Sequence, residues 1–190
     1  LCDAIADSIL DACLKEDPNA RVACEVLATA GKILVAGELR TTASPDVEAI
    51  VRQTVRNAGY GCNYNVEVRL HTQSPDIAGA VDGETLGAGD QGIMYGYACW
   101  ETVELLPAPV VLANRITSLL TTCREEKLIS GIGPDGKAQV SVQYAFGVPE
   151  RVDTIVISCQ HDADKDPDEL REELRRLVIA RACHDVHIDE

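Results

Sequence analysis

A long irregular segment, residues 73–89, divides this chain, and regular hydrophobic patterns flank it on both sides. The segment is rich in Gly, Asp and Ala and has no sustained period of apolar residues. Connections longer than roughly 12–15 residues without regular structure are usually functional lids or linkers. The sequence therefore predicts a first unit over residues 1–72, a mobile loop over 73–89 and a second unit over 90–190.

The hydrophobic periods in the two units predict helices and strands in a similar order. In the first unit we expect a helix over residues 1–17, followed by a hairpin of strands 21–29 and 33–39. A second helix should follow, capped by Ser44, with Pro45 at its first position and Gly59 at its end. A strand over 66–70 should complete the unit. In the second unit we expect a strand over residues 92–99, a helix over 107–123, strands over 137–144 and 152–159, and a helix capped by Asp166. This order indicates an α+β fold of repeated units, each an antiparallel or mixed sheet with helices packed on one face.

The composition limits the kinds of partner. The formal net charge of −14 argues against nucleic acid, whose phosphates require clustered Lys and Arg. Apolar stretches are too short to span a membrane. The eight cysteines form no CxxC pair, which favours a reducing, cytoplasmic compartment over zinc binding or a disulfide framework.

Residues 131–137 match the first seven positions of a phosphate-binding P-loop. The eighth position should be Ser or Thr but is Ala138, and a strand is expected to follow where a P-loop requires a helix. We therefore reject a P-loop and expect a Gly-rich turn, from which Lys137 could still reach a phosphate as a point charge.

Glu25 and Glu38 each lie in an otherwise apolar strand pattern. If these carboxylates are buried, a cation should be near each, because an unpaired buried charge costs several kcal/mol. The alternative is that both lie on the solvated face of an antiparallel sheet. The pattern alone does not decide between the two.

The most specific segment is Gly-Ala-Gly-Asp-Gln-Gly at residues 87–92, followed by Gly96 and Tyr97. It resembles the first signature of S-adenosylmethionine synthetases. Shorter segments similar to that family follow in the family's order over nearly the whole chain, at residues 20–25, 35–38, 73–77, 106–109, 134–137 and 142–144.

The resemblance implies an enzyme that joins methionine to the adenosyl group of ATP. The methionine sulfur attacks C5′ of the ribose, and the released triphosphate is hydrolysed to phosphate and diphosphate. Two Mg²⁺ ions, a K⁺ ion and lysines stabilise the anionic leaving group, in a homodimer or tetramer with the active site at the subunit interface. By this resemblance, Glu25 binds potassium, and the methionine site contains Glu38, Gln73 and Asp90. ATP contacts Asp135, Gly136 and Lys137, of which Lys137 is also catalytic. Residues 73–89 form the loop that closes over the site.

Two parts of the family pattern are not found in the sequence. The family's His-Pro-Asp-Lys element, which supplies a magnesium ligand, would precede Leu1, and the C-terminal part with its basic ATP-binding residues would follow residue 190. We therefore expect the chain as given to be weakly active or inactive. The alternatives are a catalytically incompetent chain that dimerises and binds nucleotide or methionine, and a generic α+β ligand-binding module.

Overall fold

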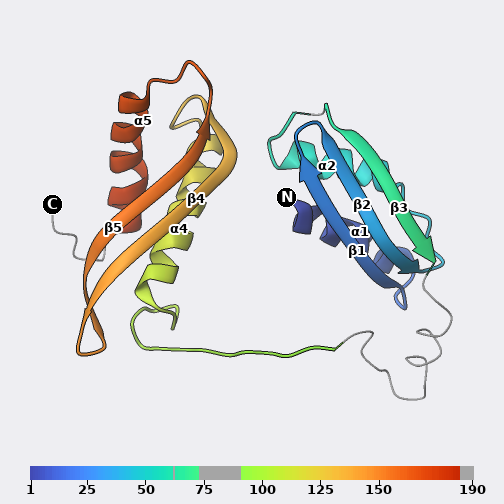
Figure 1. Ribbon diagram of the computed structural model, residues 1–190, viewed down its shortest axis with the longest axis horizontal. Coiled ribbons are helices and arrows are strands. Elements are labelled where there is room, and N and C mark those ends of the chain that lie inside the picture. The colour runs from blue at the N-terminus through green and yellow to red at the C-terminus, as the bar shows by residue number, and fades with distance from the viewer. Residues whose placement is uncertain (62, 73–90, 185–190) are drawn as a thin grey trace. The chain divides into compact units, whose positions relative to one another are not determined.

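The computed structural model describes residues 1–61, 63–72 and 91–184 of the 190-residue chain. It divides into two compact units, Leu1–Ile93 and Met94–Glu190 (Figure 1). Each unit packs helices on a β-sheet, so the predicted α+β class is confirmed. Among the described residues, no helix combines the length and the apolar character needed to cross a bilayer.

The first unit is a three-stranded sheet with two helices on one face (Figure 1). Its elements are α1 (Cys2–Glu16), β1 (Arg21–Thr29), β2 (Lys32–Arg40), α2 (Val47–Asn57) and β3 (Asn65–Thr72). β1 pairs with β2 antiparallel and β2 pairs with β3 in parallel, so the sheet is mixed. Between the helices and the sheet lies a core of Ile5, Ile9, Cys13, Ile33, Val35, Val51 and Val55.

The start of α2 corrects one prediction. The helix begins at Val47, and its N-cap is Asp46 rather than Ser44. The Asp46 carboxylate accepts a hydrogen bond of 3.0 Å from the Ala49 N–H. Asp46 offers a side-chain acceptor directly before the first apolar residue of the helix, so it takes the cap position. Gly59 follows the helix with a φ of 88°, as expected of a C-terminal stop.

Glycines shape the hairpin of β1 and β2. Gly31 lies in the tight turn with a φ of 71°, a conformation that residues with a Cβ rarely adopt. Gly37 lies inside β2 with a φ of 142°, and a Cβ at this position would collide with the Ala23 carbonyl oxygen. The close pairing of the two strands therefore requires glycine at position 37.

The second unit packs its helices on one face of a long two-stranded hairpin (Figure 1). Its elements are α4 (Ala108–Glu125), β4 (Ile132–Ala145), β5 (Val148–His161), α5 (Pro167–Leu174), a π-helical turn η1 (Arg175–Ile179) and α6 (Ala180–Ala182). The buried core of this unit comprises Leu112, Ile116, Leu120, Cys123, Ile129, Val152, Leu170, Val178, Ala182 and Cys183. Asp166 caps α5 as predicted, accepting hydrogen bonds from the N–H groups of Asp168 and Glu169.

The strand predicted over residues 92–99 is wrong. Residues 91–99 form no β-ladder with any described residue, and Ile93, Met94, Tyr95 and Tyr97 are 72 to 90% exposed. An extended apolar segment becomes a strand only where a partner strand satisfies its backbone groups. Within the described part of this chain that partner is missing.

The Gly-rich turn predicted over residues 131–137 is also wrong beyond its first residues. Most of this segment belongs to β4, with a register shift between Ile132 and Gly136 that forms a bulge. The Gln160 side chain packs over Gly133, where a Cβ would collide with it, and its Oε1 accepts a hydrogen bond of 3.3 Å from the Asp135 N–H. The bulge therefore accommodates Gly133 and Pro134 within β4.

Candidate functional site

Glu25 and Glu38 lie together on the helix-free face of the first sheet. In the antiparallel register Glu38 pairs with Ala23 and Glu25 pairs with Ala36, so the two carboxylates are diagonal neighbours on adjacent strands. Both side chains are exposed. The structure therefore supports the solvated face rather than burial beside a cation.

These two carboxylates differ from a third on the same face. Glu67 of β3 accepts from Lys32 at 2.6 Å and from Arg69 at 2.8 Å. The hydrogen bond from Lys32, with that from Arg69, lowers the pKa of the Glu67 carboxyl. Glu25 and Glu38 make no hydrogen bond or ion pair with any side chain in the described ranges. Their negative charge is available to a cationic ligand.

The described residues do not make a magnesium site. Within residues 1–61, 63–72 and 91–184 there is no group of three His, Cys, Asp or Glu side chains that could hold a metal ion. Mg²⁺ requires near-octahedral oxygen ligands and is usually held by one or two carboxylates together with substrate phosphates. Glu25 offers a single carboxylate, which could serve as one oxygen ligand of K⁺.

The residues predicted to contact ATP lie at the bulged end of β4. Lys137 is exposed on the helix-free face of the hairpin, opposite Ser158. Gly136 faces the core instead, where an added Cβ would come within 3.0 Å of Leu120. Asp135 is exposed, and its charge adds to burial in raising the pKa of the Cys159 thiol. Of the three, Lys137 is the group that can reach a polyphosphate.

The predicted site residues therefore divide between the two units. Glu25 and Glu38 share one sheet face in the first unit, and the segment 135–137 lies in the second. Gln73, Asp90 and the predicted loop 73–89 lie outside the described residues.

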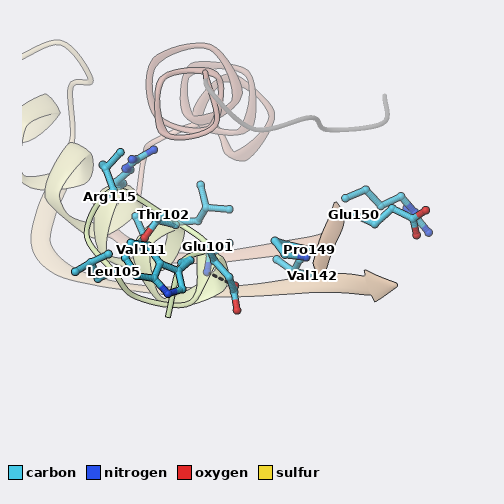
Figure 2. A pocket seen from close by; sticks show the side chains of 13 residues that line it. Glu101, Thr102, Leu105, Val111, Arg115, Val142, Pro149 and Glu150 are labelled. Atoms are coloured by element: carbon cyan, nitrogen blue, oxygen red, sulfur yellow. Dashed lines mark hydrogen bonds between the residues drawn. The ribbon is translucent and has the colours of Figure 1, made fainter. Parts of the chain in front are cut away.

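The second unit also contains a cavity of about 710 Å³ that the sequence did not indicate (Figure 2). The loop before α4 lines one side, the first turns of α4 line another, and the tip of the β4–β5 hairpin completes it. Its walls include Leu105, Val111, Leu112, Val142 and Pro149, with Glu101, Arg115, Glu150 and Arg151 as charged residues. Of the described residues predicted for methionine or ATP, none lines this cavity.

Glu101 fixes the loop beside this cavity. One oxygen of its carboxylate accepts from the Ala108 N–H at 2.9 Å and from the Tyr144 hydroxyl at 2.7 Å. The bond from Ala108, with that from Tyr144, lowers the pKa of the Glu101 carboxyl. Burial, followed by the hydrogen bond to Glu101, raises the pKa of Tyr144 to about 12. The one sequence signal for this arrangement is that Pro107, the N-cap of α4, has no side-chain acceptor of its own.

Further bonds close the same loop on itself. The Cys99 N–H donates to the Leu105 carbonyl at 2.9 Å, and the Thr102 hydroxyl donates to the Leu106 carbonyl at 2.8 Å. Arg115 of α4 holds Glu104 at 3.1 Å. These bonds thus fix the conformation of residues 99–106, which follow directly after segment 91–98.

Comparison with known proteins gives consistent matches along the whole chain. Residues 1–84 match the family model for the N-terminal domain of S-adenosylmethionine synthetase, and residues 85–190 match that for its central domain. The chain is 41% identical to an S-adenosylmethionine synthase of Finegoldia magna over all of its own length and 54% of the relative's. It is 46% identical to one of Nitratiruptor, over 94% of this chain and 49% of that protein. The chain thus spans about half the length of these relatives.

The two helix-backed sheets, each with polar side chains on its open face, place the chain among α+β proteins. With both domain models matched in order, the chain belongs to the S-adenosylmethionine synthetase family.

Proposed function

We propose that this chain supplies part of the active site of a methionine adenosyltransferase. The reaction is attack of the methionine sulfur on C5′ of ATP, which forms S-adenosylmethionine and releases triphosphate for hydrolysis to phosphate and diphosphate. The support is that both family models cover the chain without a gap between them.

Two exposed side chains carry the proposed substrate contacts. Glu38 would bind the ammonium group of methionine, and Lys137 would face the polyphosphate of ATP as a binding and catalytic cation. Both are exposed on helix-free sheet faces, and neither makes an ion pair with a described residue. We assign Gln73 and Asp90 to the methionine site and Asp135 and Gly136 to the ATP segment on the resemblance alone.

We also propose that the complete site uses two Mg²⁺ ions and one K⁺ ion, with Glu25 offering an oxygen to K⁺. These ions would neutralise the charge that develops on the departing triphosphate. Among the described residues, no group of three His, Cys, Asp or Glu side chains could hold Mg²⁺. We expect a cytoplasmic homodimer or tetramer with the site at the subunit interface.

A second candidate is a chain that dimerises and binds nucleotide or methionine without turnover. The chain spans about half the length of each relative, and the relatives' names do not show whether this part alone turns over substrate. A coupled assay for S-adenosylmethionine distinguishes the two candidates. We expect weak or no turnover by the 190-residue chain; a rate typical of the family would contradict this expectation.

Calorimetry with a nonhydrolysable ATP analogue and Mg²⁺ tests the polyphosphate contact separately from turnover. Lys137→Ala should weaken binding about tenfold, because a charge-assisted contact to phosphate is lost. Lys15→Ala removes the same charge from the exposed end of α1 and should have no effect. Equal affinities of the two variants would remove Lys137 from the site.

The methionine contact has its own test. Glu38→Gln should weaken methionine binding about tenfold, whereas Glu16→Gln on α1 should leave it unchanged. Unchanged affinity in Glu38→Gln would contradict the proposed role of the first sheet. Both variants change exposed side chains, so their thermal unfolding should match that of the parent chain.

A further inference from the structure

Glu38 has a basic neighbour that the proposed site does not yet include. In the parallel pairing of β2 with β3, Glu38 is in register with His71, and Ala36 is in register with Arg69. Residues in register on adjacent strands project from the same face of a sheet. His71 is exposed and therefore lies beside Glu38 on the helix-free face.

Near Glu38, side chains of opposite charge lie on adjacent strands. The carboxylates Glu25 and Glu38 lie on β1 and β2, and the basic side chains Arg69 and His71 lie on β3. Other charged side chains in register on the same face are Arg21, Lys32, Arg40 and Glu67. At this register position a carboxylate on β2 thus lies beside a basic side chain on β3.

Small residues surround this meeting point. Ala23 lies across from Glu38 on β1, and Ala36 precedes it by two residues on β2. Leu27 and Leu34, which pair with each other, extend an apolar surface further along the same strands. A ligand with two opposite charges and an apolar chain could therefore approach the backbone closely here.

The two basic groups are not equally available. Arg69 donates to Glu67 at 2.8 Å, which also holds Lys32. His71, like Glu38, has no hydrogen bond or ion pair with another residue of the described ranges. Of the basic side chains on β3, His71 is the one next to Glu38 and the one left available to a ligand.

We propose that His71 binds the carboxylate of the α-amino acid whose ammonium group Glu38 binds. Adjacent strands lie roughly 4.8 Å apart, and the two charged groups of an α-amino acid are attached to one carbon, so a single ligand can contact both side chains. The apolar chain of the ligand would then lie over Ala36 and Leu34. This inference rests on the proposed function, because it takes Glu38 as the ammonium site.

The test compares L-methionine with L-methioninol, which keeps the ammonium group and the thioether but lacks the carboxylate. Each ligand is titrated into the ¹⁵N-labelled 190-residue chain and followed by NMR. His71→Gln should lower the affinity for L-methionine about tenfold and leave that for L-methioninol within about twofold. His71→Arg, which places a guanidinium group at the same position, should recover methionine binding.

Two matched variants separate this inference from the role of Glu38. Glu38→Gln should weaken both ligands, because both carry the ammonium group. His161→Gln removes an exposed histidine at the end of β5 and should weaken neither.

The remaining outcomes each count against the proposal. Equal weakening of both ligands by His71→Gln, without recovery in His71→Arg, would make His71 a structural residue and overturn the inference. No weakening at all would overturn it while leaving Glu38 in place. If the parent chain bound neither ligand, the proposed methionine site itself would fail, and the inference with it.

Discussion

Tyr144 of β4 donates a hydrogen bond of 2.7 Å to Glu101, a residue 43 positions earlier in the loop that precedes α4. The same carboxylate oxygen accepts from the Ala108 N–H, so it joins the strand, the loop and the first turn of the helix. A carboxylate at a helix N-terminus is also favoured by the helix dipole. Glu101 thus acts as an N-cap supplied from outside the helix.

Removing the Tyr144 hydroxyl should destabilise the second unit. We expect Tyr144→Phe to lower the free energy of unfolding by about 0.5–1 kcal/mol, since the bond is charge-assisted but partly exposed. Because the pKa of Tyr144 is raised from 10.0 to about 12, this contribution is complete below pH 10 and is lost as the pH rises through 12. Urea unfolding of both chains at neutral and alkaline pH checks this, and a constant difference above pH 12 would contradict it.

A series of glycine replacements should separate backbone strain from steric collision in the first unit. Gly61→Ala, with no positive φ and open space around it, should be nearly neutral. Gly31→Ala adds only the cost of a positive φ, about 1 kcal/mol. Gly37→Ala adds a collision with the Ala23 carbonyl to the same strain and should cost more than either. Thermal unfolding followed by circular dichroism gives the ranking, and a neutral Gly37→Ala would show that β2 pairs differently.

The N-cap of α5 should contribute measurably to stability. Asp166 accepts from the Asp168 N–H at 2.8 Å and from the Glu169 N–H at 3.3 Å. Asp166→Ala should therefore cost about 1 kcal/mol. The control is Asp164→Ala, which removes the same charge outside the cap. Similar losses in the two variants would point to general electrostatics instead of capping.

Asp17 should make the stability of the first unit depend on pH in the acid range. Its carboxylate accepts from the Thr42 N–H at 2.8 Å and from the Asn19 N–H at 3.0 Å, which ties the end of α1 to the chain after β2. The bond from Thr42, with that from Asn19, lowers the pKa of Asp17 below its ordinary value of 3.8. The contribution is therefore present above pH 3.8 and is lost as the pH falls through the lowered pKa.

Asp17→Asn should accordingly be less stable than the parent at pH 7, and the difference should shrink in strong acid. Asp11→Asn on the exposed side of α1 is the control. Acid titrations of unfolding by circular dichroism measure both. Parallel acid curves for Asp17→Asn and the parent would rule out the carboxylate as the titrating group.

Local periodicity was sufficient for the elements that pack within their own unit. The four-residue spacing of Ile5, Ile9 and Cys13 predicted α1 because those side chains do fill one core. It failed at residues 92–99, because an apolar extended pattern does not show whether a partner strand exists. It also failed at residues 131–137, because the packing of Gln160 over Gly133, which accommodates the bulge, joins residues far apart in sequence.

In the candidate site too, individual residues were predictable from the sequence, but contacts between distant residues were not. The resemblance supplied Glu38 and Lys137, and the structure found both exposed on open sheet faces. The spatial neighbours of these residues became apparent only from the strand pairing in the structure. His71 is in register with Glu38 only because β3 runs parallel to β2, and nothing in the local sequence encodes that choice. The bond between Glu101 and Tyr144 joins residues 43 positions apart, and its one sequence signal is the missing side-chain acceptor of Pro107.

Trp100 is the single tryptophan of the chain, and this residue, which is 94% exposed, lines the cavity of the second unit. Its emission therefore reports on one locality: a small molecule or a polypeptide that enters the cavity should shift the indole fluorescence to shorter wavelength. The chain thus carries an intrinsic optical probe that can detect occupancy of this cavity without any label.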